Sequence, residues 1–189
     1  MTKGLQKKVI FPLGICLFLF LSSCGWSKKE QIQNQMDHAT RQAQMELEAG
    51  KFQRAIDICK EIYQKYPQDP TVQSGYIKTL ESIKSGGDRA FEKSDFALAG
   101  CVYEILLKNV SSVDRLNGSF SFNREDLTAR IRDCKKILFE NGLEQYRSGD
   151  LNQAISLWKS ILTFDPENQE IKKAVDIATL QFKNLQKAK

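Results

Sequence analysis

Three stretches of this chain repeat one arrangement of apolar residues, and that arrangement limits the fold more than any other feature. In each stretch, apolar or small residues recur every three or four positions, which places them on one stripe of a helix. A short polar turn and a second apolar stripe follow. The turns are EAGKF at 48–52, EKSDF at 92–96 and RSGDL at 147–151. The pattern predicts an all-α fold made of helical hairpins.

The residues of the stripes keep the same order in all three stretches. Before the turns they are Ile32, Met36, Ala39, Ala43 and Leu47; Val72, Tyr76, Leu80, Ile83, Gly87 and Phe91; and Leu127, Ile131, Cys134, Leu138, Gly142 and Tyr146. After the turns they are Phe52, Ala55, Ile56, Cys59, Ile62 and Tyr63; Phe96, Ala99, Gly100, Tyr103, Leu106 and Leu107; and Leu151, Ala154, Ile155, Trp158, Ile161 and Leu162.

This order resembles the tetratricopeptide (TPR) repeat, a pair of antiparallel helices with small residues where the two approach closely. The small residues of that family correspond to Ala43, Gly87 and Gly142 in the first helices and to Ala55, Ala99 and Ala154 in the second. The proline that ends a TPR is matched by Pro67 and Pro166, whereas Ser111 departs from it. The resemblance implies a short α-solenoid of about three hairpins.

The spacing departs from the TPR family. Gly50 to Ser94 is 44 residues and Ser94 to Gly149 is 55, against a usual period of 34. We attribute the extra length to first helices of about 22–25 residues. The expected divisions are repeats at about 27–69, 70–113 and 123–168, an inserted loop at 111–123 and a C-terminal capping helix at 169–189.

Local signals predict where the long helices begin. Ser27 with Glu30 forms a capping-box pattern, Pro70 suits a first helical turn, and Asn123 suits an N-cap. The Gly86–Gly87 pair is expected to weaken the second long helix, with a kink or a break as the outcome, because each Gly costs about 1 kcal/mol relative to Ala.

The N-terminus has the pattern of an export signal. Residues 1–8 carry three lysines and no acid, and residues 9–21 are apolar apart from one Gly and one Pro, which is typical of a secretory signal. LSSC at 21–24 resembles the bacterial lipobox. The resemblance implies a signal peptide at 1–23, cleavage between Ser23 and Cys24, and acyl chains such as palmitate on Cys24. The alternatives are an ordinary signal peptide with a chance cysteine, or an uncleaved anchor.

The anchor would place the protein in the bacterial cell envelope. More than one acyl chain is needed for lasting attachment, and residues 24–26 leave only a very short tether. Residue 25 is Gly, so the Asp of the familiar inner-membrane retention signal is absent. In a Gram-negative host this favours the outer membrane, with the protein facing the periplasm.

Composition and motifs argue against nucleic-acid binding and against catalysis. The net charge of +5 falls to about +2 from residue 24 onward, with 25 basic and 23 acidic residues, and no basic cluster stands out. His38 is the only histidine, and no metal-ligand, phosphate-loop or nucleophile motif occurs. We expect no enzyme activity, cofactor, metal or small-molecule substrate. Cys59, Cys101 and Cys134 are interpreted as small hydrophobes; whether two of them form a disulfide stays open.

Partner binding is the expected function, and six residues are candidates for it. By the TPR resemblance, the groove-facing positions are Thr40, Gln44 and Leu47; Lys84, Asp88 and Phe91; and Phe139, Leu143 and Tyr146. Phe91, Phe139, Leu143 and Tyr146 are candidates there, with core packing as the alternative. Phe120 and Phe122 in the inserted loop either pack on the adjacent helices or meet a partner.

Two function classes remain at this point. The first is a membrane-anchored scaffold or adaptor that binds envelope proteins, their peptides or their helices, in an assembly or secretion complex. The second is an accessory module that presents substrate or client proteins to a membrane-bound envelope enzyme, for example in cytochrome maturation or peptidoglycan remodelling. Self-association alone is a third possibility.

Overall fold

The computed structural model describes residues 20–110 and 119–187, with side chains from residue 28 onward. These residues form seven helices and no strand, which confirms the all-α prediction. The helices are α1 (Phe20–Glu48), α2 (Phe52–Lys65), α3 (Pro70–Glu92), α4 (Phe96–Val110), α5 (Arg124–Ser148), α6 (Leu151–Leu162) and α7 (Gln169–Lys187). The predicted signal residues 1–19, the side chains of Ser23 and Cys24, and residues 111–118 of the predicted inserted loop lie outside this description.

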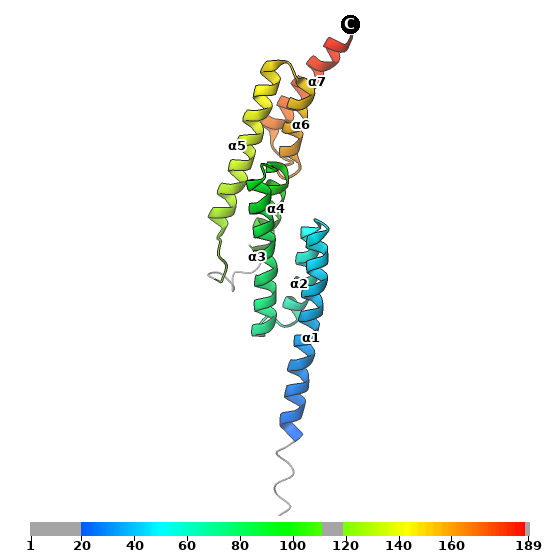
Figure 1. Cartoon of the computed structure of the whole chain (residues 1–189), viewed down its shortest axis with the longest axis vertical. Coiled ribbons are helices and arrows are strands. Elements are labelled where there is room, and N and C mark those ends of the chain that lie inside the picture. Colours follow the sequence, from blue (N-terminus) through cyan, green and yellow to red (C-terminus); the bar gives the residue numbers. More distant parts are fainter. Residues whose placement is uncertain (1–19, 111–118, 188–189) are drawn as a thin grey trace, which may run out of the picture.

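The helices stack along one long axis (Figure 1). Each helix packs on its neighbour in sequence, so α1–α2, α3–α4 and α5–α6 form hairpins and α7 packs on α6. Between hairpins, α1 also contacts α3, α2 contacts α4, and α4 contacts α6. The result is an elongated array in which each hairpin contacts the next.

The three predicted turns end the first helices where the sequence placed them. Each turn contains one residue with a left-handed backbone, and these have φ values of 72° at Gly50, 61° at Ser94 and 88° at Gly149. Glycine adopts this conformation without steric cost, whereas a residue with a Cβ does not. Ser94 is therefore the strained member of three equivalent turns.

The predicted starts of the second and third long helices are confirmed. Pro70 lies in the first turn of α3, and the Asp69 side chain accepts hydrogen bonds from the backbone N–H groups of Thr71 and Val72. Asn123 caps α5 in a reciprocal capping box with Asp126. These two helices have 23 and 25 residues, in agreement with the predicted length of about 22–25.

The first helix begins earlier than the sequence predicted. Helix α1 runs for 29 residues from Phe20, so position 27 lies inside it and the prediction that Ser27 is its N-cap is wrong. A capping residue stabilises a helix end by about 1 kcal/mol, but it does not stop a helix whose preceding residues can continue the hydrogen-bond ladder. The short tether predicted at 24–26 is helical for the same reason.

Helix α3 continues through Gly86 and Gly87 without a break. A Cβ at Gly87 would lie 2.9 Å from Tyr103 Cε1 and 3.0 Å from Val102 Cγ1 on α4. A Cβ at Gly142 would likewise overlap the Trp158 indole. Both glycines allow the two helices of a hairpin to approach closely, in agreement with the small residues expected there.

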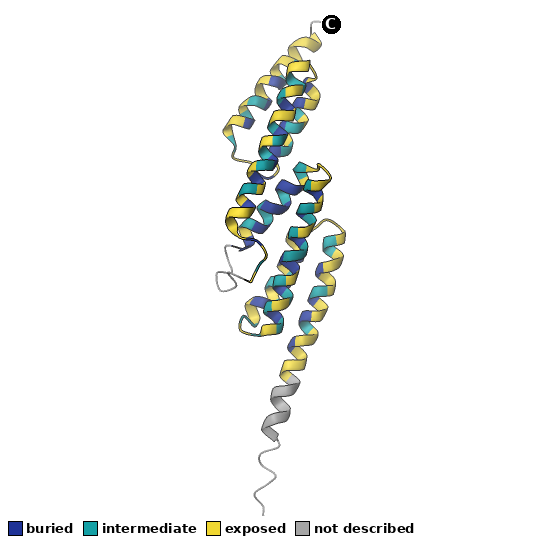
Figure 2. Cartoon of the chain, turned by 60° about the vertical axis from the view of Figure 1, so that its left-hand side comes forward, coloured by how far each residue is buried: buried dark blue, intermediate teal, exposed yellow. Residues whose placement is uncertain are grey.

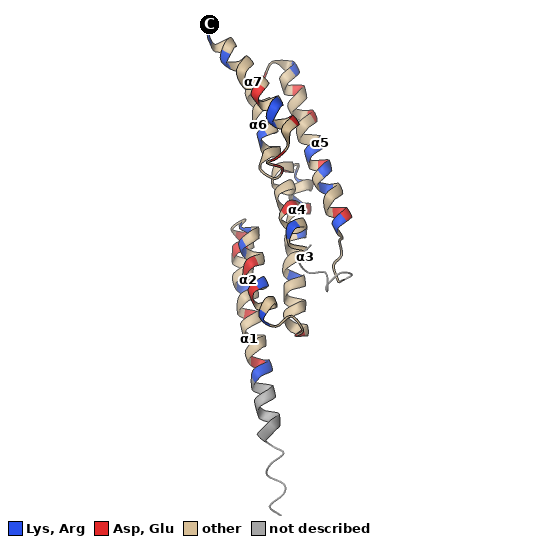
Figure 3. Ribbon diagram, turned by 180° about the vertical axis from the view of Figure 1, so that it is seen from behind, with Lys and Arg blue, Asp and Glu red and all other residues tan. Residues whose placement is uncertain are grey.

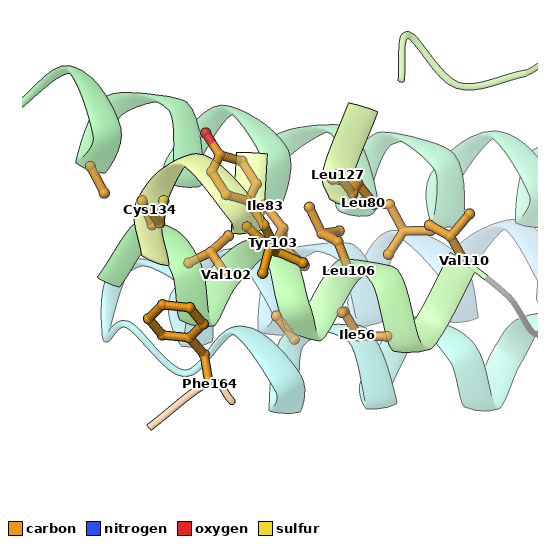
Figure 4. Close-up of a cluster of buried hydrophobic side chains, with 14 of the residues drawn as sticks. Ile56, Leu80, Ile83, Val102, Tyr103, Leu106, Val110, Leu127, Cys134 and Phe164 are labelled. Carbon is orange, nitrogen blue, oxygen red and sulfur yellow. The ribbon is translucent and has the colours of Figure 1, made fainter. Parts of the chain in front are cut away.

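The core runs along the inner faces of the hairpins, with exposed residues on the outside (Figure 2). Its central part brings Ile56 from α2, Leu80 and Ile83 from α3, and Leu127 from α5 around α4 (Figure 4). Tyr103 and Leu106 of α4 are fully buried at this point. Each fully buried Leu, Ile or Val side chain of this core contributes about 1.5–3 kcal/mol by its burial.

Candidate partner-binding grooves

A groove runs between α1 and α3, here called the α1–α3 groove. It consists of two hollows of about 440 and 430 Å³ that share Lys78. One hollow is lined by Gln44, Leu47, Phe52 and Arg89 among others, and the second by Gln33, Asp37, Thr40 and Thr71 among others. Three of the predicted groove-facing residues, Thr40, Gln44 and Leu47, therefore line this groove.

The two walls of the α1–α3 groove carry opposite charge. On α1, the Gln33 side-chain amide donates to Asp37 over 3.0 Å and the Gln44 amide donates to Glu48 over 3.1 Å. These bonds hold the carboxylates along the wall. On α3, Lys78 and Arg89 are exposed, whereas Glu81, which also lines this wall, is half-buried and accepts two hydrogen bonds from Ser121 of the inserted loop. Charged residues lie on all seven described helices (Figure 3). In this groove, the acidic residues of α1 face the two basic residues of α3.

A smaller pocket of about 230 Å³ lies where the inserted loop meets α3 and α5. Lys84 ion-pairs with Asp88 over 2.7 Å, and the Tyr103 hydroxyl donates to the other Asp88 oxygen over 2.8 Å. Burial, and then the hydrogen bond to Asp88, raise the pKa of Tyr103 well above its usual range. The predicted groove residues Lys84 and Asp88 thus form a polar network above a buried tyrosine.

The loop phenylalanines pack on the protein. Phe122 is buried and Phe120 is half-buried against the core, with ring centroids 5.4 Å apart. Between them, the backbone N–H and the hydroxyl of Ser121 donate to the two carboxylate oxygens of Glu81, each over 2.6 Å. Of the two interpretations given for this loop, packing describes both side chains in this structure.

The four remaining candidates, Phe91, Phe139, Leu143 and Tyr146, are half-buried and contact the core. Phe91 packs edge-on against Phe96, and the Arg130 guanidinium lies 5.0 Å from its ring centre. Phe139 and Tyr146 flank Trp158 with centroid distances of 6.2 and 5.8 Å, and the Tyr146 hydroxyl donates to Gln181 over 2.6 Å. Each of these aromatic residues therefore supports packing and leaves only part of its surface for a partner.

Sequence reasoning missed the basic wall, formed by Lys78 and Arg89. The helical periodicity of α3 contained part of the signal, because Lys78 and Arg89 are eleven positions apart and therefore share one side of the helix, opposite the buried stripe of Tyr76, Leu80 and Ile83. These two residues could be recognised as one wall of a groove only once α1 and α3 were known to be neighbours in space.

The single histidine and three of the five cysteines have described side chains. His38 is exposed on α1, and within residues 28–110 and 119–187 no group of three or more His, Cys, Asp or Glu side chains could hold a metal. Cys59 and Cys134 are buried and Cys101 is half-buried, all as free thiols. Burial raises the pKa of Cys134 to about 11 and raises the pKa of Cys59. Their environment fits small hydrophobic residues.

None of the seven described helices combines the length and the apolar character that crossing a membrane requires. Comparison with known proteins gives no match to any family model, curated protein or solved structure.

Proposed function

We propose that this protein is a non-catalytic adaptor with a short TPR-like solenoid, which binds a segment of another protein in the α1–α3 groove. The observation that carries the proposal is the groove itself, with its acidic wall on α1 and its basic wall on α3. An extended or helical segment that carries both charge signs would satisfy both walls. Such complementarity favours specificity and association rate more than affinity.

The TPR-like part of the proposal is supported by equivalent positions in the three hairpins. Ala55, Ala99 and Ala154 are fully buried near the start of each second helix. The residues with a left-handed backbone lie at the same place in each turn. The contacts of α1 with α3 and of α2 with α4 are those expected when one hairpin stacks on the next.

The envelope address is a second part of the proposal and rests on the LSSC motif. Acylation of Cys24 would hold the first hairpin close to a membrane, because α1 runs from Phe20 into the first hairpin. Partners would then be envelope proteins at that membrane, facing the periplasm if the host is Gram-negative. The intact mass of the chain from membrane fractions, compared with a Cys24→Ser variant, tests this part alone.

The groove is tested by reversing its basic wall. We expect Lys78→Glu/Arg89→Glu to abolish co-purification of the native partner from crosslinked membranes, because the variant replaces two attractive charges with repulsive ones. Lys159→Glu, an exposed lysine on α6, is the matched control and is expected to leave the partner bound. Equal recovery of the partner with wild type and with the double variant would contradict the proposal.

A further inference from the structure

Helix α7 presents apolar side chains that no described residue covers. Ile171, Val175 and Ala178 face the hairpin below, and the C-terminal part of α7 projects past the end of that hairpin (Figure 1). On its outer side Ile177 and Leu180 are 51% and 62% exposed. Large exposed apolar side chains that cluster on one helix indicate an interaction surface.

The same side of α7 is basic. Lys173, Lys183 and Lys187 follow the helical spacing of Ile177 and Leu180, and Asp176, four positions before Leu180, is the single acidic residue on this side from position 173 to 187. We refer to Lys173, Ile177, Leu180, Lys183 and Lys187 as the α7 outer face. It combines an apolar centre with a basic border.

The opposite end of the molecule carries a groove of complementary chemistry, here called the α1–α2 groove. It is a hollow of about 870 Å³ whose apolar lining residues are Ala39, Ile58 and Ile62. Glu30 and Glu61 also line it, and no Lys or Arg does. The remaining lining residues are polar: Gln31, Asn34, Gln35, His38 and Gln42.

The α1–α2 groove lies at the end of the hairpin stack. Helix α3 packs on another side of α1, where Gln33, Asp37 and Thr40 line the α1–α3 groove. The α3–α4 hairpin is covered by the hairpin before it, whereas no described hairpin covers α1 and α2 on this side. The groove and the α7 outer face therefore lie at opposite ends of the array.

We propose that the α7 outer face of one copy docks in the α1–α2 groove of a second copy, head to tail. Ile177 and Leu180 then cover Ile58 and Ile62, and the lysines of α7 meet Glu30 and Glu61. A head-to-tail contact leaves one free surface at each end of a dimer, so the assembly extends into longer oligomers. The contact uses no residue of the α1–α3 groove, which keeps its own role.

The test is sedimentation velocity of the full chain in detergent, over a range of concentrations and at low salt. One variant removes the α7 outer face, Leu180→Gln/Lys183→Glu, and a second removes the groove, Ile58→Gln/Glu61→Lys. Leu98→Gln, an exposed apolar residue on α4, is the matched control. Circular dichroism confirms that each variant keeps its helices.

Wild type and the Leu98 control are expected to form a ladder of oligomers that weakens with added salt. Each defective variant alone is expected to stay monomeric up to at least about tenfold higher concentration. An equal mixture of the two defective variants should form dimers and nothing larger, because each supplies one working surface. A chain with Lys183→Glu and Glu61→Lys together should recover association.

Three results would overturn the proposal. A wild-type chain that stays monomeric at every concentration shows that the surfaces do not bind each other. A groove variant that still dimerises while the α7 variant does not indicates a symmetric α7–α7 contact. Association that survives in both variants places the interface elsewhere.

Discussion

Two buried tyrosines show that two helix contacts of this molecule are built differently. One is the first junction, between α2 and α3, and the other is the central junction, between α3 and α4. Tyr76 and Tyr103 are both fully buried. Tyr76 stacks on Tyr63 with ring centroids 5.1 Å apart, and among the described residues its hydroxyl is buried without a hydrogen-bond partner. Tyr103 packs against Gly87 and donates its hydrogen bond to Asp88.

The same residue type thus serves two purposes along the array. At the first junction the tyrosine joins α2 to α3 by ring packing alone, and its hydroxyl costs stability. At the central junction it joins α4 to α3 by packing and by a charge-assisted hydrogen bond to Asp88. Asp88 in turn ion-pairs with Lys84, which lines the small pocket where the inserted loop meets α3 and α5. Substitutions that remove the whole side chain or only the hydroxyl therefore measure the ring packing and the hydrogen bond separately.

The largest effect is expected for Tyr103→Ala. Deleting a fully buried aromatic ring removes its transfer free energy and leaves a cavity, so the free energy of unfolding should fall by about 3–5 kcal/mol. Chemical denaturation followed by circular dichroism measures this. Leu98→Ala, at an exposed position, should change it by less than about 0.5 kcal/mol. Equal effects of the two changes would contradict the burial of Tyr103.

Removing only the hydroxyl of Tyr103 should have the next largest effect. Tyr103→Phe keeps the ring and loses a hydrogen bond to a charged group, so the free energy of unfolding should fall by about 1.5–3 kcal/mol. A double-mutant cycle with Asp88→Asn measures the coupling between the two groups. A coupling energy near zero would show that the hydrogen bond contributes nothing.

Both tyrosines should make the free energy of unfolding depend on pH in the alkaline range. Burial raises the pKa of Tyr76 and of Tyr103 above the ordinary value. Above about pH 10 the unfolded chain ionises these hydroxyls while the folded protein keeps them neutral, so the free energy of unfolding is unaffected below about pH 10 and falls above it by about 1.4 kcal/mol per pH unit for each tyrosine. Denaturation from pH 8 to 11 should show a shallower loss for Tyr76→Phe and for Tyr103→Phe than for wild type. Identical slopes would contradict the raised pKa values.

At the first junction, loss of the hydroxyl should stabilise the protein. Tyr76→Phe keeps the stacking on Tyr63 and removes a buried polar group that lacks a partner, so the free energy of unfolding should rise by up to about 1 kcal/mol. Tyr76→Phe and Tyr103→Phe are therefore expected to change the free energy of unfolding in opposite directions. Destabilisation by Tyr76→Phe of more than about 1 kcal/mol would show that its hydroxyl has a partner.

The smallest expected effect concerns the turn between the helices that carry the two tyrosines. Ser94→Gly relieves a left-handed backbone and should raise the free energy of unfolding by roughly 0.5–1 kcal/mol. Ser85→Gly, in the interior of α3, should instead lower it by a similar amount. The thermal midpoints of the two variants, measured together, should move in opposite directions.

Local features of the fold were predictable from the sequence because each depends on a few neighbouring residues. The turns at Gly50 and Gly149, the start of α3 at Pro70 and the cap at Asn123 are of this kind. The start of α1 was not predictable from Ser27, because the capping pattern competes with continuation of the helix on its N-terminal side.

Features that depend on helices distant in sequence were less predictable. Thr40, Gln44 and Leu47 were placed on the groove by their equivalence to a known repeat. The basic wall, with Lys78 and Arg89, was missed because these residues form a groove only together with α1, which is distant in sequence. The periodicity of apolar residues predicted that Tyr76 is buried, but it could not predict that its hydroxyl lacks a hydrogen-bond partner.

The most direct test of partner binding in the α1–α3 groove is site-specific photocrosslinking in the native host. A photoreactive residue at Ser85, exposed in the groove, is compared with one at Ser156, exposed on α6. We expect a discrete crosslinked partner from position 85 that is absent from position 156 and absent when Lys78→Glu/Arg89→Glu is present. The same crosslinked band from both positions, or none from position 85, would contradict the account.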